Sequence, residues 1–296
     1  MKFMFFTLGG RLFWEDVYNF QDWIIQKNVR TLNYRLLDPH NIRRASGTFE
    51  QCRDELIKYI EAYEMAAPYD DSIVLIPGFG QSKKALRELA KELKDLPANI
   101  IIFNYASLRQ TLIYHANILT QFLKNIKTKN RTSFITIGSG GLVLRKLIEN
   151  SYNYRNYNIY RVLEINPLNS GSDFAELLEK NKYAFKLAGP MIRDITPKKA
   201  VALAKLPQEI EHGLLFCSQP WKALIRKILS RYDSFPIASR PSEESFAKVV
   251  YKVTEPFEPP LKDKSIIGLC RRYIENGYFL DNKQSQNQSE SSTPKN

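Results

Sequence analysis

Histidine and cysteine are scarce in this chain, with only three of each among 296 residues. The cysteines, Cys52, Cys217 and Cys270, are far apart, odd in number and without a Cys-x-x-Cys spacing. This pattern argues against a disulfide framework and against a zinc site built on paired cysteines. We therefore predict reduced thiols in a cytoplasmic protein that uses no metal and no cofactor.

Long apolar runs are also missing. No stretch reaches the 18 or more apolar residues that a membrane-spanning helix needs. Residues 1–10 are apolar, but they lack a basic leading region and a small-residue cleavage site, and Arg11 and Glu15 follow at once. We predict neither a transmembrane helix nor a signal peptide.

The charge balance is basic. The 43 Lys and Arg residues against 31 Asp and Glu give a net charge of +12. The basic residues are spread along the chain and accompany no nucleic-acid motif, so we predict no nucleic-acid partner. A solvated basic surface and an anionic membrane surface as partner both stay open, since such a charge attracts phosphates. Nothing in the sequence specifies an oligomeric state.

Residues 1–68 are predicted to form an N-terminal helical extension. Apolar residues between Trp14 and Ile25 recur at helical spacing. A second helix is predicted to begin after Thr48, because Thr48 and Gln51 have the spacing of a capping box. We interpret the aromatic face of this region as domain packing.

Residues 69–280 show short apolar runs that alternate with amphipathic helices. The runs are residues 72–76, 100–103, 134–137, 160–165, 213–217 and 248–253. Strands buried on both faces and alternating with helices predict an α/β domain around a mostly parallel sheet. Residues 173–210 are predicted to form a helical insertion or cap. Residues 281–296, rich in Gln, Ser and Asn, are predicted to be a disordered tail.

One motif in this domain predicts where chemistry takes place. Residues 134–145 are a buried strand, a glycine turn and the start of a helix, which is the local form of a nucleophile elbow. The run Gly140-Gly141-Leu142-Val143-x-Arg145 resembles the second half of the His-Ser-x-Gly-Gly-Leu-Val-x-Arg motif of lipase-like α/β hydrolases. The sequence thus resembles the lipase/esterase branch of the α/β-hydrolase superfamily.

Other segments extend this resemblance over roughly residues 11–280. The matching segments are Val74–Ser82, Asn104–Ser107, His115-Ala116, Asn166–Ser172 and Tyr273–Phe279. The resemblance implies the α/β-hydrolase fold, with a mostly parallel central sheet flanked by helices. It also implies an oxyanion loop and ligand pocket formed by Pro77, Gly78, Phe79, Gly80 and Tyr105.

The positions that carry the family's chemistry differ. The nucleophilic Ser falls on Gly138, the His before it on Ile137, and the oxyanion-loop His on Pro77. The late catalytic His should lie within residues 255–262, which contain none. Asp233 occupies the place of the catalytic acid and is either that acid or an ordinary turn residue. The resemblance therefore implies a lipase/esterase-like protein that has lost the Ser and His of the triad and binds a lipid, an acyl ligand or a partner.

Ser139 leaves a second hypothesis open. It lies one residue beyond Gly138, so a slipped nucleophile would give an active serine ester hydrolase, with a remote base such as His115. The alternative is that Ser139 is a structural turn residue and His115 a packed helix residue. The two glycine turns, at 78–80 and 138–141, lack the dinucleotide-binding and P-loop patterns, and anion binding at either is a further alternative to a structural role.

Overall fold

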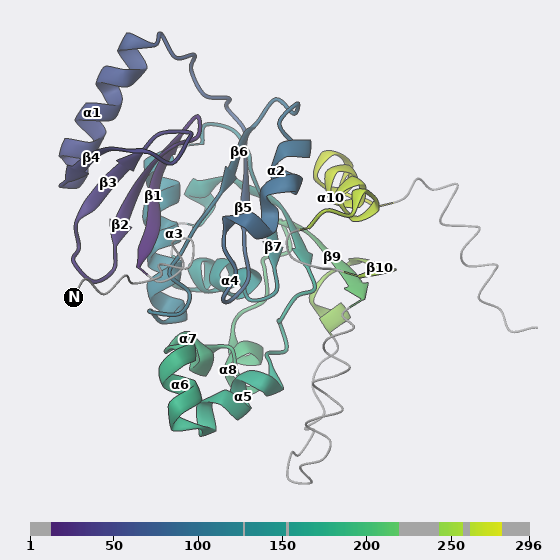
Figure 1. The fold of residues 1–296 in the computed structure, drawn as a ribbon. Coiled ribbons are helices and arrows are strands. Elements are labelled where there is room, and N and C mark those ends of the chain that lie inside the picture. The colour runs from purple at the N-terminus through teal and green to yellow at the C-terminus, as the bar shows by residue number, and fades with distance from the viewer. Residues whose placement is uncertain (1–12, 127, 152–153, 219–242, 257–260, 280–296) are drawn as a thin grey trace, which may run out of the picture.

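The structure, a computed structural model, describes residues 13–126, 128–151, 154–218, 243–256 and 261–279. Figure 1 shows a small N-terminal sheet beside a larger central sheet, with a group of short helices below them. Asp233 and the predicted tail of residues 281–296 lie outside the described residues.

The N-terminal sheet corrects one prediction. Residues 14–25, predicted as helix, belong to a four-stranded antiparallel sheet in the order β1-β2-β3-β4. Its strands are β1 (Trp14–Phe20), β2 (Trp23–Asn28), β3 (Tyr34–Leu37) and β4 (Arg43–Gly47).

Two local features explain why the helical prediction was wrong. Gln21 and Asp22 have φ values of 45° and 69°, and this left-handed pair makes the two-residue turn that joins β1 to β2. A register shift between Asp16 and Tyr18 breaks the alternation expected of a strand, so Glu15, Asp16 and Val17 are all buried. Aromatic and β-branched residues then favour the strands.

The helix predicted after Thr48 is confirmed. It is α1 (Phe49–Ala62), and Thr48 and Gln51 make both hydrogen bonds of the capping box. Cys52 and Leu56 of this helix pack with the buried residues of the N-terminal sheet. Trp23 stacks on Tyr59 with ring centroids 4.6 Å apart. The aromatic face of this region therefore contributes to packing.

The central sheet confirms the predicted α/β class. It has six parallel strands in the order β10-β9-β8-β7-β5-β6. These strands are β5 (Ser72–Ile76), β6 (Asn99–Ile102), β7 (Thr132–Ile137), β8 (Ile159–Ile165), β9 (Glu211–Ser218) and β10 (Val249–Pro256).

Helices cover both faces of this sheet (Figure 1). One face carries η2 (Lys83–Leu86), α2 (Arg87–Glu92) and α10 (Lys264–Asn276), and the other carries α3 (Leu112–Ile126) and α4 (Gly140–Asn150). Alternate residues of one strand reach the two layers: Ile73 packs with α2 and α10, and Val74 packs with α3 and α4. Short 3₁₀ turns, η3 (Tyr154–Tyr157) and η4 (Glu243–Phe246), lie in the connections.

The predicted helical insertion is present as four short helices between β8 and β9. They are α5 (Asp173–Lys180), α6 (Lys182–Ala188), α7 (Met191–Asp194) and α8 (Pro197–Ala202), and together we call them the cap. The cap follows the carboxyl end of β8, the edge where sites of α/β proteins gather. No helix in the described ranges is both long and apolar enough to cross a membrane.

Candidate functional site

The turn after β7 is where the sequence places the reacting group. Gly138 has a φ of +52°, Ser139 has a φ of −70°, and α4 begins at Gly140. A side chain on Gly138 would have room, because its Cβ would lie 3.8 Å from the nearest atom, the carbonyl oxygen of Asn166. At Gly140 a Cβ would lie 2.8 Å from the Ile76 carbonyl oxygen, so this glycine permits the close approach of α4 to β5. The chain therefore has space but no functional group at position 138.

Ser139 is turned into the protein interior. Its side chain is 1% exposed, and its Oγ accepts a hydrogen bond from the Phe79 N–H at 2.8 Å. The Tyr105 hydroxyl lies beside it and donates to the Pro77 carbonyl oxygen at 3.0 Å. Burial raises the pKa of Tyr105, and the hydrogen bond with Ser139 opposes that rise only in part. In the described part of the chain, Ser139 makes no hydrogen bond with a histidine, and its role as a nucleophile stays a prediction.

The predicted oxyanion loop makes its hydrogen bonds within the chain. In α/β hydrolases such a loop offers a backbone N–H to the oxygen of the reacting carbonyl. Here three successive backbone N–H groups already donate to side chains. The acceptors are Gln81 Oε1 for Gly78 (2.9 Å), Ser139 Oγ for Phe79 and Ser107 Oγ for Gly80 (3.1 Å). Binding of an oxyanion by this loop would require these bonds to break.

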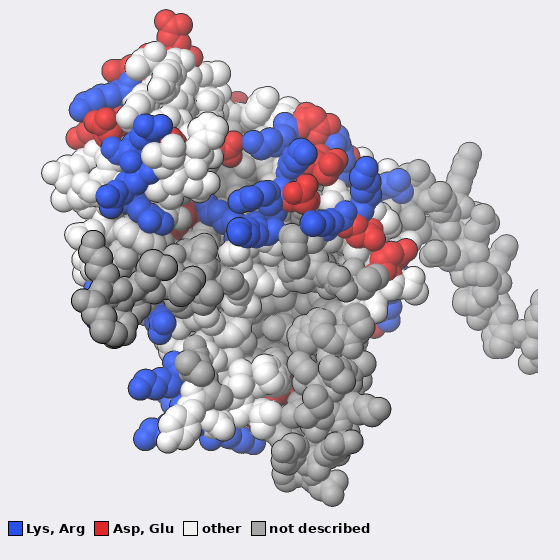
Figure 2. Space-filling view, in the orientation of Figure 1, with Lys and Arg blue, Asp and Glu red and all other residues white. Residues whose placement is uncertain are grey.

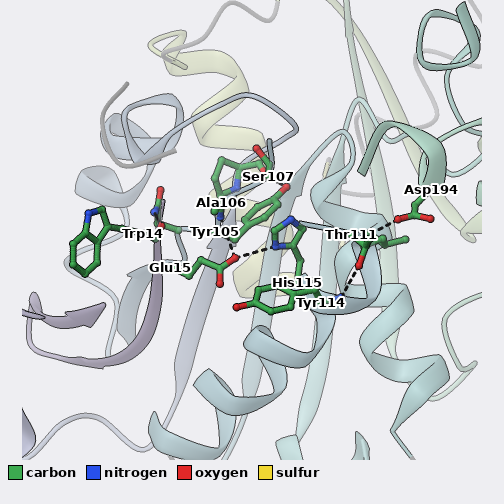
Figure 3. Close-up of polar contacts among 12 residues, drawn as sticks. Trp14, Glu15, Tyr105, Ala106, Ser107, Thr111, Tyr114, His115 and Asp194 are labelled. Atoms are coloured by element: carbon green, nitrogen blue, oxygen red, sulfur yellow. Dashed lines mark hydrogen bonds and ion pairs between the residues drawn. The ribbon is translucent and has the colours of Figure 1, made fainter. Parts of the chain in front are cut away.

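His115 lies nearby and is paired with a buried carboxylate through one ring nitrogen. Figure 3 shows its ring on α3 facing Glu15 of β1, with Nδ1 3.1 Å from the Glu15 Oε1 and both side chains fully buried. The edge of the imidazole packs against Tyr105, with centroids 4.8 Å apart. Its Nε2 has no hydrogen-bond partner in the structure. The contact of Glu15 with His115 was not predicted, because residues 14–25 were predicted as helix.

Asp16, the next residue of β1, attaches the N-terminal sheet to the central domain. Its N–H donates to the Asn104 carbonyl oxygen at 2.8 Å, and its Oδ2 accepts the Asn104 N–H at 3.0 Å. Lys83 Nζ lies 2.6 Å from the same carboxylate. The segment that begins at Asn104, matched above to a family motif, thus positions β1 beside the candidate site.

Arg145 ends the motif that resembles the hydrolase family, and the structure gives it a structural contact. The side chain is 1% exposed and donates to the carbonyl oxygens of Leu203 and Ala204, at the end of the cap. It also donates to Asn169 Oδ1 at 3.0 Å. Arg145 therefore ties α4 to both ends of the cap.

Glu164 of β8 lies in the same buried network. Its carboxylate accepts a hydrogen bond from the Asn169 amide and lies 3.5 Å from His212 Nε2. Burial acts to raise the pKa of Glu164, but His212, Asn169 and Arg145 outweigh burial and hold that pKa below its usual value. This ionised group joins β8 to β9 below the glycine turn.

Asn166 provides a polar group that the sequence indicated only as part of a turn motif. It follows β8 with a φ of +45°, and its Oδ1 accepts the Cys217 N–H at 2.9 Å. Its Nδ2 is buried and has no hydrogen-bond partner in the structure. Most buried donors in proteins are satisfied, so this unpaired donor, on a residue whose backbone carbonyl oxygen faces Gly138, is a candidate contact for a bound acceptor.

The arrangement of strands around this turn decides the fold. β7 lies inside a parallel sheet of order β6-β5-β7-β8-β9-β10 and leads through the left-handed Gly138 into α4, while the loop after β5 closes over the turn. The chain has the α/β-hydrolase fold. The late catalytic residues of that fold would follow β9 and β10; Asp233 and residues 257–260 lie outside the described ranges.

Comparisons with known proteins give similarities at low sequence identity only. No protein-family model and no curated protein matches the chain. Among solved structures, it is similar to lipase BlEst2 from Bacillus licheniformis (12% identity, 65% of this chain and 86% of that one, TM-score 0.45). It is also similar to polyneuridine aldehyde esterase (11%, 70% and 99%, TM-score 0.46).

A third similar structure is phospholipase PlaB from Legionella pneumophila, at 14% identity and a TM-score of 0.42. The match covers 50% of this chain and 38% of the phospholipase, so the chain spans under half of that protein. No group of three or more His, Cys, Asp or Glu side chains in the described ranges could hold a metal ion.

Proposed function

We propose that this protein is a catalytically degenerate lipase/esterase-like hydrolase that binds a lipid or another acyl ligand at the turn of Gly138. The observation that carries the proposal is the buried, unpaired Nδ2 of Asn166, the residue whose backbone carbonyl oxygen lies 3.8 Å from the Cβ position of Gly138. An ester or carboxyl oxygen placed there would accept the missing hydrogen bond.

The turn of Gly138 has an apolar neighbour, as the binding of an acyl chain requires. Leu168 lies 3.9 Å from the Cβ position of Gly138. Leu168, Phe79 and Phe185 are half-buried and pack against the core cluster that includes Met191 and Ile192 of the cap. Apolar walls with few polar groups are typical of sites for apolar small molecules.

Three features argue against ester hydrolysis. Gly138 has no nucleophile, His115 makes no hydrogen bond with Ser139 in the described part of the chain, and the loop N–H groups donate to the chain's own side chains. A serine hydroxyl needs an adjacent base to become nucleophilic. The three cysteines are free thiols, which supports our proposal of a cytoplasmic location.

Binding of a fluorescent fatty acid to the purified protein tests the proposal. Gly138→Leu fills the space, so we expect its affinity to fall at least about tenfold, by the loss of roughly 1.4 kcal/mol of binding. Gly268→Leu is the matched control, because a Cβ on Gly268 meets no atom within 4 Å, and its affinity should equal that of the parent. Thermal melts check that both variants fold. Absence of fatty-acid binding by the parent, or equal affinity of both variants, would contradict the proposal.

A further inference from the structure

The positive charge of the chain is concentrated in the part of the cap that begins at the last residue of α5 and in the loop after α8, whereas the rest of α5 contains Asp173, Glu176 and Glu179. Residues 180–208 contain seven Lys and Arg and one acidic residue, Asp194. Seven minus one gives +6, which is half of the net charge of +12 in a tenth of the chain. In Figure 2 the cap, at the bottom of the view, shows Lys and Arg side chains with little acidic colour among them.

Three lysines of the cap are free of acidic partners. Arg193 and Lys199 form ion pairs with Glu179 and Asp194, at 3.6 and 3.3 Å. Lys182, Lys186 and Lys198 are exposed, and the structure shows no ion pair for them with any described residue. These are the three cations that can meet an outside anion without first breaking a salt bridge.

The α6 helix adds an aromatic residue to these cations. Lys182 and Lys186 are four residues apart and lie on one side of the helix. Tyr183, next to Lys182, is 83% exposed, while Phe185 is half-buried and packs against the core. Basic residues around an exposed aromatic on an amphipathic helix favour the headgroup region of a lipid bilayer.

We infer that the cap docks on an anionic lipid surface through Lys182, Tyr183, Lys186 and Lys198. The lysines meet lipid phosphates, and the Tyr183 ring enters the boundary between headgroups and acyl chains. A polyanion such as RNA would use the same charges, but α6 exposes a single ring, Tyr183, beside its lysines, which favours a lipid surface over a strand of stacked bases. This docking goes beyond the acyl-ligand site and does not depend on it.

Flotation of the full chain with lipid vesicles tests the inference. We expect binding to phosphatidylcholine vesicles containing about 30% phosphatidylglycerol, weak binding to phosphatidylcholine alone, and loss of binding as NaCl is raised. Replacing Lys182, Lys186 and Lys198 together by Gln should weaken binding about a hundredfold, at roughly 1 kcal/mol for each lysine near the surface.

The matched control replaces Lys84, Lys124 and Lys262 by Gln, because these lysines are exposed, lie outside the cap and leave the same net charge. Its binding should stay within about threefold of the parent.

Tyr183→Ser should reduce binding to anionic vesicles and leave binding to a uridine-rich oligonucleotide unchanged. The inference is wrong if the parent does not bind anionic vesicles at low salt, or if it binds only the oligonucleotide. It is also wrong if both triple variants lose vesicle binding equally. Fatty-acid binding without vesicles is measured separately, so its failure would affect only the proposed function.

Discussion

Gly138 is the residue on which the proposed loss of serine chemistry mainly rests. The backbone has a left-handed φ of +52°, and a Cβ would meet no atom closer than 3.8 Å, so the turn itself would accept a side chain. Gly-to-Ser at such a position costs about 1 kcal/mol in backbone strain and supplies a hydroxyl. The substitution supplies neither a general base nor an unoccupied backbone N–H in the loop after β5.

We predict that Gly138→Ser does not restore ester hydrolysis. In the described part of the chain, His115 makes no hydrogen bond with residue 138 or 139, and the Phe79 N–H is bonded to Ser139. Hydrolysis of p-nitrophenyl acetate by the variant should equal that of the parent. A rise of tenfold or more would show that a base reaches position 138 and would contradict the account.

Ser139 has a structural role that stability measurements can detect. Ser139→Ala leaves the buried Phe79 N–H without an acceptor, which should lower the free energy of unfolding by about 1–3 kcal/mol. Ser151→Ala, at the end of α4 and with no side-chain hydrogen bond in the described residues, should change it by less than about 0.5 kcal/mol. Urea titrations of both variants measure the difference. Equal midpoints would exclude the hydrogen-bonded role of Ser139.

At the scale of elements, the N-terminal sheet depends on a few buried polar contacts. Asp16→Asn removes the charge that Lys83 and the Asn104 N–H share, and we expect a loss of about 1–3 kcal/mol in unfolding free energy. Asp22→Asn is the control, because its ion pair with Lys94 is more than half exposed. That change should cost at most about 0.5 kcal/mol. Urea unfolding measures both variants. Similar losses of unfolding free energy in the two would mean that Asp16 does not anchor the sheet.

The sequence predicted some elements closely and others wrongly, for identifiable reasons. Apolar runs of parallel strands are short and bounded by turns, so residues 72–76 coincide with β5. The capping box of Thr48 and Gln51 correctly predicted where α1 begins. In β1, by contrast, buried Glu15 and Asp16 interrupt the apolar face, and the partners that satisfy them, His115 and Asn104, are about 90 to 100 residues away. Periodicity within a strand does not reveal such distant partners.

The same contrast applies to the candidate site. The glycine turn and the loop after β5 were located from spacing, because their backbone geometry demands small residues. The unpaired Asn166 amide and the hydrogen bonds that occupy residues 78–80 were not predicted. Those features depend on how three loops meet in space, which no local pattern encodes.

At the scale of the whole molecule, the Glu164 network connects the central sheet with the cap. Because the folded-state pKa of Glu164 is held below its usual value, ionised Glu164 stabilises the protein above the usual carboxyl pKa, about pH 4.3. That contribution is lost as the pH falls below this value. We predict that Glu164→Gln makes stability less dependent on pH between about 3 and 5, measured by urea unfolding at several pH values. A variant with the same pH dependence as the parent would show that the fold does not lower the pKa of Glu164.

The central claim is that the hydrolase scaffold is retained without its serine chemistry. Labelling of the purified parent protein with a fluorophosphonate probe tests it most directly, with an active serine esterase as positive control and Ser139→Ala beside it. The account predicts no labelling of the parent under conditions that label the control completely. Labelling of the parent that disappears in Ser139→Ala would contradict it and would identify Ser139 as the nucleophile of an active enzyme.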